Sequence, residues 1–569
     1  TNCTSKIIIV TSSSEQHHTV QQLVRPHFRP AMATASELDR CVPDTWLAHQ
    51  KSLPDLPVPE IAASLKLFFE CVAPLVSEDD LAEAKRCAAA LEAGGEAAEL
   101  QDRLLAYDAS RKGQASFIES FWTSAYLTPD DSVVLNVNPF FILEEDPTPQ
   151  GKSQIDRAAS LVFSSLKFIN VMRAGKLAAT VWRGTPLCMS QVCGSLFGCA
   201  RVPQEGSDFI RKAPLSAARH VVVLCQSQFY SFNVLGDDDT VLVDEDDIAR
   251  ILASIVRDAS ATGARESAMA RAIGIMTAHS RANWAGVRAS LEAVPRNREI
   301  LSRIDAALFV LCLDDVAPTT IDEIAANALH GTYAVNDDGA QIGTCLNRWF
   351  DKLQIIVCEN GAASMNFEHT AVDGHTVLRF AADTFADTVV RFARRCIAGS
   401  ATVPDFLPAT VSSAASEAKA ARSAARAASK DGASGQPAAK MSKPGPAIER
   451  VARKLEWKLG PGEIDAIRYA EANVSDLITQ NEVIVLEFED YGKQFIVRNN
   501  LSPDAFVQVA MAYAHAALWG DMPSMYEPVL MKRFRHGRTE ASRSVSFVSR
   551  HKNWDDAFVL SLELARNAS

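Results

Sequence analysis

The sequence predicts an α/β protein with two successive α/β units. Between Phe117 and about Ala401, short β-prone runs alternate with stretches whose apolar residues recur at helical spacing. Two of these runs, residues 353–357 and 363–369, flank Asn360-Gly361, a strong β-hairpin signal. A second set of strand-like and helical segments follows residue 445. Together these patterns exclude an all-helical or all-β chain.

The predicted elements begin with helices. After a proline-rich entry at residues 53–59, apolar residues at helical spacing over 60–107 predict packing helices. The strands expected in the first unit are residues 133–137, 221–224, 230–234, 308–311, 353–357 and 363–369. In the second unit, residues 455–459 and 483–488 are expected as strands and residues 503–519 as a helix.

Composition excludes several classes of protein. The 569 residues, 47% of them hydrophobic, can bury two or more cores. No apolar run approaches the roughly 20 residues that span a bilayer, so no transmembrane segment is expected. The formal charge of -12 argues against nucleic-acid binding. The twelve cysteines form no Cys-x-x-Cys pair or Cys/His cluster, which predicts no metal site, buried thiols and a reducing compartment.

Both chain ends and one internal stretch depart from these patterns. Residues 1–44 are expected to be a leader or disordered, with Met32 as a plausible true start. Glu37 and Asp39 do not suit a mitochondrial transit peptide. Residues 405–445, rich in Ala, Ser, Lys and Arg, are expected to be a solvated linker. Residues 555–568 have an amphipathic helical pattern that stops abruptly.

The most informative motif is His369-Thr370-Ala371-Val372-Asp373-Gly374, which follows the predicted hairpin. A histidine at a strand end suits the base of an acyltransferase whose nucleophile is the hydroxyl of its substrate. Asp373 can be a second catalytic carboxylate, or it can orient the loop through an ion pair. The chain has no Gly-x-Ser-x-Gly elbow, Walker loop or Gly-x-Gly-x-x-Gly.

Many segments, in one order from about residue 50, resemble the choline/carnitine O-acyltransferase family. They are residues 53–59, 184–189, 199–203, 219–224, 274–277, 304–309, 347–352, 369–374, 491–493, 501–506, 526–527 and 537–540. The resemblance implies reversible acyl transfer between coenzyme A and the hydroxyl of carnitine, with His369 as general base and acid. Choline O-acetyltransferase and a non-catalytic acyl-coenzyme-A-binding relative are the alternatives.

The resemblance also implies binding residues for coenzyme A. Lys493 matches a position that holds the 3'-phosphate, and Arg498 stands beside the place of a frequent second lysine, occupied here by Val497. Asp504, with Ser502, matches the pantetheine and nucleotide side. As alternatives, Lys493 is merely solvated, and Ser502 and Asp504 start a helix.

For the alcohol, Tyr526 and Thr539 match positions whose hydroxyls meet the carboxylate of carnitine, with Glu527 beside the first. An exposed Tyr526-Glu527 pair is the alternative. Arg538 attracts anions, but the resemblance assigns the carboxylate's arginine to a later segment.

The fold implied by the resemblance has two chloramphenicol-acetyltransferase-like domains, each a mixed sheet flanked by helices, the second truncated. Residues 45–111 are expected to pack on the second domain. Residues 112–404 would form the histidine-bearing domain, and residues 446–569 the incomplete domain that binds coenzyme A and carnitine. The expected protein is an intracellular monomer in the cytoplasm, peroxisome or mitochondrial matrix. It uses acyl-coenzyme A as a co-substrate and has no tightly bound cofactor.

Overall fold

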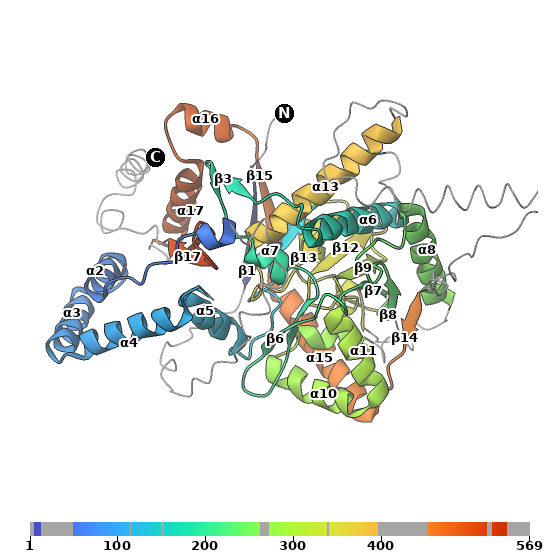
Figure 1. The fold of residues 1–569 in the computed structure, drawn as a ribbon, viewed down its shortest axis with the longest axis horizontal. Helices are drawn as coiled ribbons and strands as arrows, with labels where there is room; N and C mark the ends of the chain where they lie inside the picture. Colours follow the sequence, from blue (N-terminus) through green and yellow to red (C-terminus); the bar gives the residue numbers. More distant parts are fainter. Residues whose placement is uncertain are drawn as a thin grey trace, which may run out of the picture.

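A seven-stranded mixed sheet forms the centre of the protein (Figure 1). The computed structural model describes residues 5–12, 49–113, 115–148, 153–261, 272–337, 341–396, 452–520 and 526–542. The strand order is β14 (Arg453–Leu455), β8 (Gln228–Asn233), β7 (His220–Cys225), β9 (Val310–Asp314), β12 (Gln354–Cys358), β13 (Ala363–Asn366) and β2 (Phe140–Ile142). The α/β class predicted from the sequence is confirmed.

The three middle strands, β7, β9 and β12, run parallel, and the strands on either side of them pair antiparallel. All residues of the three are buried, which explains why they read as continuous apolar runs and not as alternating ones. The predicted hairpin is confirmed. Strands β12 and β13 pair from Gln354↔Asn366 to Val357↔Ala363, and Gly361 takes the positive φ of 86° that the turn requires.

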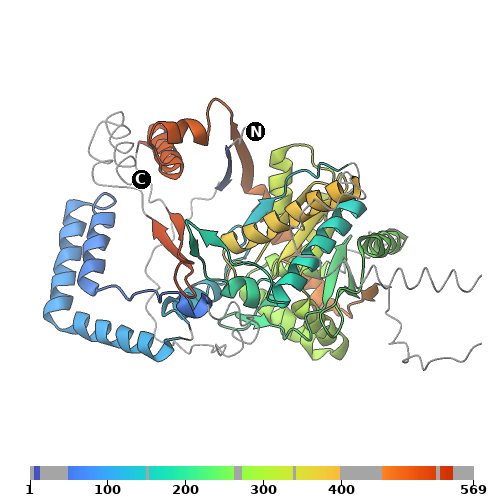
Figure 2. The ribbon, with the colours of Figure 1, turned by 45° about the horizontal axis from the view of Figure 1, so that its top comes forward.

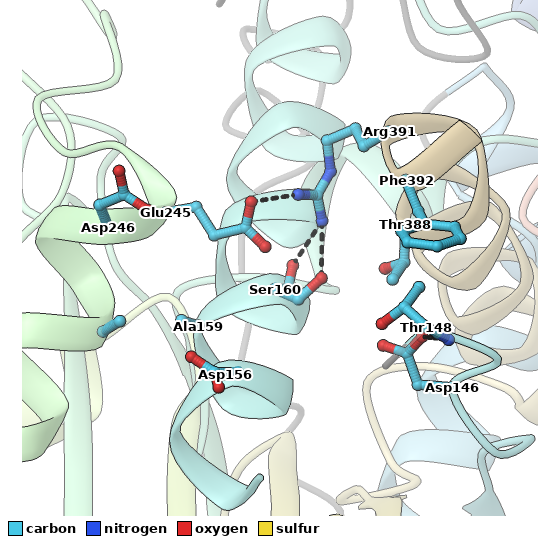
Figure 3. Close-up of a pocket in the computed structure, with 11 residues that line it drawn as sticks. Asp146, Thr148, Asp156, Ala159, Ser160, Glu245, Asp246, Thr388, Arg391 and Phe392 are labelled. Carbon is cyan, nitrogen blue, oxygen red and sulfur yellow. Dashed lines mark hydrogen bonds and ion pairs between the residues drawn. The ribbon is translucent and has the colours of Figure 1, made fainter. Parts of the chain in front are cut away.

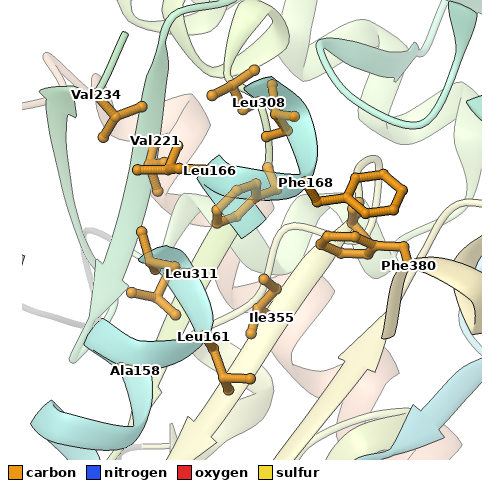
Figure 4. Packing of buried hydrophobic residues seen from close by; sticks show 14 of the residues in the cluster. Ala158, Leu161, Leu166, Phe168, Val221, Val234, Leu308, Leu311, Ile355 and Phe380 are labelled. Carbon is orange, nitrogen blue, oxygen red and sulfur yellow. The ribbon is translucent and has the colours of Figure 1, made fainter. Parts of the chain in front are cut away.

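Helices α6 (Gln154–Arg173), α8 (Glu245–Ala261) and α13 (Gly374–Cys396) cover one face of the sheet (Figures 1 and 2). Figure 4 shows Phe168 of α6 and Phe380 of α13 packed above Leu311 and Ile355 of the sheet. The rings of Phe168 and Phe380 meet edge to face with centroids 5.3 Å apart. This packing fixes the start of α13, and the loop that carries His369 leads directly into that start.

The opposite face is covered by η3 (Ile273–Ala278), α10 (Arg281–Ala293), α11 (Pro295–Ala306) and α15 (Pro461–Thr479), with the short η4 (Thr344–Leu346) below them. Fully buried Trp284 and Trp349 pack edge to face there, with ring centroids 5.9 Å apart. Helix α12 (Ile321–Leu329) lies against β2, β13 and β15 (Asn481–Phe488). Strand β14 and α15, from beyond residue 446, therefore complete the same layered unit as the central sheet.

The segment Asn347 to Lys352 ties the sheet together. Arg348 is fully buried and forms two hydrogen bonds with Asp314 at the end of β9, at 2.7 and 2.8 Å. The Lys352 ammonium donates to the carbonyl oxygens of Cys199 and Asp305, at 2.7 and 2.8 Å. These contacts satisfy buried charges within the fold. The segment Asn347 to Lys352 therefore has a structural role, which is to hold together the sheet that carries the histidine loop.

The remaining elements lie around this unit. They are α2 (Ile61–Val72), α3 (Glu78–Ala93), α4 (Glu96–Arg111), α5 (Ile118–Leu127), α7 (Ser190–Gly194), α16 (Lys493–Arg498) and α17 (Pro503–Trp519). The strand pairs are β3–β4 (Val181–Trp182, Thr185–Pro186), β5–β6 (Cys199–Val202, Phe209–Lys212), β10–β11 (Ala334–Val335, Gln341–Ile342) and β16–β17 (Glu527–Leu530, Thr539–Ser542). Helices α2 to α4 extend away from the sheet (Figure 2). The helices predicted there are present, and α2 and α3 bury no residue. Their packing on a second domain stays a prediction.

Several sequence-based expectations need comment. Residues 133–137 form a turn and not a strand: Leu135 has a φ of 66°, and the sheet begins only at Phe140. Within the expected leader, β1 (Ser5–Ser12) pairs antiparallel with β15. The linker at 405–445 and the helix at 555–568 lie outside the described residues. In the described part of the chain, no helix has the length and apolar character needed to cross a membrane.

Candidate active site

His369 lies in the seven-residue connection between β13 and α13. Its Nδ1 is 2.8 Å from the carbonyl oxygen of Val372. A carbonyl can only accept, so Nδ1 must carry a proton in this contact, and Nε2 of the neutral ring keeps its lone pair. The local turn therefore fixes both the ring and the tautomer that a general base needs.

A network of buried charged side chains stabilises the loop that carries His369. Glu368, just before the histidine, accepts from the backbone N–H of Thr370 at 3.1 Å and lies 3.5 Å from Arg201. Arg201 in turn pairs with Asp208 at 2.6 Å, and Arg281 shares that carboxylate. Each buried charge has an oppositely charged partner, which limits the desolvation cost of holding the loop in place.

Asp373 forms an ion pair with Arg538, which lies 165 residues later in the chain. The guanidinium Nη2 is 3.0 Å from Oδ1, and Nε is 3.1 and 3.2 Å from the two carboxylate oxygens. Arg538 also donates to the carbonyl oxygens of Thr370 and His369, at 2.7 and 3.2 Å. The ion pair expected for Asp373 is present, and its partner Arg538 also holds the carbonyl oxygens of the histidine and of the residue after it.

Gly537 allows this approach. A Cβ at this position would lie 2.0 Å from the carbonyl oxygen of Met531, far inside van der Waals contact. The turn between β16 and β17 is therefore too tight for a side chain there. The following residue, Arg538, can then reach the histidine loop.

An aromatic pair from α5 borders the histidine. The Tyr126 ring meets the imidazole edge to face at 5.6 Å and stacks on Trp122 at 5.1 Å. The guanidinium of Arg538 lies over the Trp122 ring at 5.1 Å. Burial, reinforced by nearby Tyr526, raises the pKa of Tyr126 to about 12. The phenol therefore stays protonated near neutral pH.

The predicted alcohol-binding residues approach this region. Thr539 starts β17 directly after Arg538, and Tyr526, 52% exposed, precedes β16. Tyr526 contributes to the raised pKa of Tyr126, whose ring contacts the His369 imidazole. Glu527 accepts from Gln508 of α17 at 2.5 Å, and burial, with Asp504 nearby, raises its pKa. Thr539 thus directly follows the arginine that holds the histidine loop, while Glu527 contacts α17.

The predicted coenzyme residues lie on α16 and α17. Lys493 and Arg498 are exposed at the two ends of α16. Neither side chain forms a hydrogen bond or ion pair within the described part of the chain. Ser502 caps α17 by accepting from the backbone N–H of Ala505 at 3.4 Å, and Asp504 lies in the first turn. Ser502 therefore does cap the helix, as the alternative interpretation expects. Its contact with coenzyme A stays a prediction.

A separate small cavity of about 200 Å³ lies between α6, α8 and α13 and contains none of the predicted site residues (Figure 3). Arg391 crosses it to reach Glu245 at 2.7 Å and the hydroxyl of Ser160 at 2.8 Å. These contacts join three helices. In the described residues, no cluster of His, Cys, Asp or Glu could hold a metal ion.

Several residues at the site were not found from the sequence. Tyr126 and Trp122 of α5, and Gln191 of α7, which donates from Nε2 to Asp373 at 2.6 Å, come from helices distant in sequence. Their immediate neighbours contain no chemical signal. Arg538 was noted but assigned no role in the loop. Only its position between Gly537 and Thr539 connected it to the site.

A family model described as choline/carnitine O-acyltransferase matches residues 56–558. With a mixed-sheet α/β fold and a histidine presented at a strand end, this chain belongs to the choline/carnitine O-acyltransferase family.

Three similar proteins are named for carnitine. A Saccharomyces cerevisiae protein assigned as a mitochondrial carnitine O-acetyltransferase is 37% identical over 530 residues, covering 87% of this chain and 73% of its own length. The mitochondrial carnitine O-palmitoyltransferase 2 of Rattus norvegicus is 29% identical over 557 residues, covering 91% and 74%. The carnitine O-acetyltransferase of the same species is 27% identical over 513 residues, covering 88% and 71%.

Proposed function

We propose that this protein is a carnitine O-acyltransferase that moves acyl groups reversibly between coenzyme A and the hydroxyl of carnitine. The observation that carries the proposal is the hydrogen bond from His369 Nδ1 to Val372, because it leaves Nε2 available as a base. The family match and the carnitine-named relatives favour this reaction over choline acetylation.

In the forward step, Nε2 of His369 removes the hydroxyl proton of carnitine as its oxygen attacks the thioester carbonyl. The tetrahedral intermediate collapses by breaking the carbon–sulfur bond. The imidazolium then returns its proton to the departing thiolate, which yields acylcarnitine and free coenzyme A. Positioned acid–base catalysis of this kind contributes about 10²- to 10⁴-fold to rate.

Asp373 and Arg538 position the loop in this scheme, and His369 alone handles the proton. Their ion pair already neutralises the carboxylate, and the arginine holds the carbonyl oxygens of His369 and Thr370. The reaction needs no nucleophile from the enzyme. In agreement with this, burial raises the pKa of the Cys312 and Cys358 thiols to about 12, which keeps them protonated.

The substrate contacts follow from the same scheme. Tyr526 and Thr539, with Glu527 beside them, receive the carboxylate end of carnitine near Tyr126. Lys493 and Arg498 receive the 3'-phosphate of coenzyme A, since both are exposed cations without partners among the described residues. Asp504, with Ser502, lines the nucleotide side.

The wider assignments belong to the same proposal. The histidine-bearing sheet is the first of two chloramphenicol-acetyltransferase-like domains, and α16, α17 and the β16–β17 hairpin belong to the second. The protein acts as a monomer inside the cell. The mitochondrial names of two of the relatives favour that organelle over the cytoplasm or the peroxisome.

Carnitine-dependent thiol release from acetyl-, octanoyl- and palmitoyl-coenzyme A tests the proposed function. We expect release with carnitine and at least about 10²-fold lower kcat/KM with choline, because choline leaves a site built for a carboxylate unpaired. Equal specificity constants for the two alcohols would reject carnitine as the acceptor. No release with either alcohol would reject acyl transfer.

A further inference from the structure

We propose that Lys532 is a positioning residue that orients the histidine loop through a directional chain of hydrogen bonds running Lys532→Thr376→Gln191→Asp373. This inference rests on the proposed function, because the loop it positions is the one that carries the catalytic base. The chain joins three parts of the protein: the β16–β17 turn, the first turn of α13 and helix α7.

The contacts are continuous. The Lys532 ammonium donates to the hydroxyl of Thr376. That hydroxyl donates to Gln191 Oε1 at 2.7 Å, and Gln191 Nε2 donates to Asp373 Oδ2 at 2.6 Å. The backbone of the lysine is fixed as well, because its carbonyl accepts from the N–H of Cys188 at 2.7 Å.

The direction of the chain is set at both ends. The backbone N–H of Asp373 donates to Gln191 Oε1 at 2.9 Å, so the amide oxygen must face it and the amide nitrogen must face the carboxylate. A charged lysine can only donate, so the Thr376 hydroxyl must accept from it and donate its own hydrogen bond to Gln191 Oε1. Each bond in such a chain strengthens the next.

The charge on Lys532 maintains this direction. A neutral amine has a lone pair that can accept, so Thr376 could then donate back to the lysine and release Gln191. Lys532 is only 3% exposed. Burial lowers its pKa to about 8, against the opposing effects of Cys188 and Asp373. Deprotonation therefore falls within an accessible pH range.

The charged and titratable groups around Lys532 come from every element that packs on it. They are Cys188 and Cys193 next to and within α7, Asp373 and His375 at the start of α13, and Arg538 on its own hairpin. Arg538 neutralises Asp373, so the lysine has no carboxylate to itself. This arrangement indicates that Lys532 orients Thr376 and does not serve as an ion-pair partner.

The expected effects are on turnover. We expect Lys532→Met to lower kcat about 10-fold with little change in the KM for coenzyme A, since small displacements of a reacting group are costly. Wild-type kcat should fall as pH rises through about 8, and the Met variant should lack that fall. Thr376→Val should lower kcat similarly, whereas Thr376→Ser keeps the hydroxyl and should behave like the wild type. Lys454→Met, which removes a lysine paired with Asp258 at the surface, is the matched lysine control.

A readout independent of turnover completes the experiment. The ¹³Cε resonance of Lys532, identified by its loss in the Met variant, should titrate near pH 8, and at a lower pH in Thr376→Val, where the ammonium loses its acceptor. An unchanged kcat profile in both Lys532→Met and Thr376→Val would overturn the inference. An unchanged lysine titration in Thr376→Val would also overturn it. A wild type that titrates as expected but releases no thiol would reject the proposed function and leave the hydrogen-bond chain supported.

Discussion

The chemistry of His369 depends on groups that hold its backbone. The imidazole forms a hydrogen bond with the carbonyl of Val372, and the carbonyl of the histidine itself accepts from Arg538. Arg538 is in turn fixed by Asp373 and by the Trp122 ring. A rigid loop of this kind lets one imidazole act as base and then as acid without reorganisation between the steps.

A double-mutant cycle on Asp373 and Arg538 tests the orienting role of the carboxylate. We expect Asp373→Asn and Arg538→Met each to lower kcat by about 10- to 100-fold, since either change frees the loop. The double variant should be little worse than either single one, because residues in direct contact are not additive. Steady-state kinetics on the four proteins measures the coupling. Fully multiplicative losses would instead mean that Asp373 and Arg538 act independently.

The site could be predicted from the sequence only in part. His369 and Asp373 are four residues apart, so a local motif contains both. Arg538 and Gln191 reach Asp373 from 165 and 182 residues away, and no local pattern encodes such contacts. The residues assigned to coenzyme A and carnitine came from a resemblance, and their roles stay predictions.

Among the secondary-structure elements, too, those set by local sequence could be predicted and those set by long-range contacts could not. Helix α17 begins at Pro503 and ends at Trp519, as predicted, because Ser502 caps it and Gly520 closes it at a φ of 79°. The strand predicted at residues 133–137 is wrong. Val133 and Val134 are β-prone but lie buried in a turn, and the pattern of apolar residues cannot distinguish a buried turn from a buried strand. The order of the central strands depends on long-range pairing and could not be derived.

Helix α15 carries a pH-dependent element. Glu471 faces the core and is 5% exposed, and its Oε1 has no hydrogen-bond partner among the residues that the structure describes. Burial raises its pKa to about 7, with Arg468 opposing. Because the folded pKa lies above the unfolded value of 4.5, this carboxyl favours folding below that value, and the benefit is lost as pH rises through about 7.

We therefore expect Glu471→Gln to be more stable than the wild type at pH 8, by about 1–3 kcal/mol, because the wild type must then bury an ionised, unpaired carboxylate whereas the amide stays neutral. At pH 4.5 the two proteins should be similar, since both side chains are neutral in the folded state. Urea unfolding at the two pH values measures the difference, with the exposed Asp465→Asn on the same helix as control. A wild type and Gln variant with parallel pH dependence would contradict this account.

Across the whole molecule, apolar side chains remain exposed on the elements that follow the central sheet. Leu518 and Trp519 at the end of α17 are 73% and 68% exposed, and Leu486 on β15 is 50% exposed. Exposed apolar side chains of this size favour association. Any association beyond the expected monomer is therefore expected to involve these exposed side chains.

Replacing Leu518 and Trp519 by lysine should reduce concentration-dependent association without lowering the unfolding temperature, because neither side chain contributes to a core. Light scattering across a concentration series measures the association. Lys454→Met changes a surface charge elsewhere and is the control for general charge effects. Unchanged scattering in the double lysine variant would show that α17 is not the associating surface.

The central claim is that His369 carries the proton in acyl transfer, and the kinetics of His369→Ala test it most directly. We expect kcat for carnitine-dependent thiol release to fall by about 10³-fold or more, because a base acts on the reaction and not on binding. Affinity for coenzyme A, measured by calorimetry on the same variant, should stay within a few-fold of the wild type. Near-normal turnover in the variant would contradict the assignment of His369 as the catalytic base.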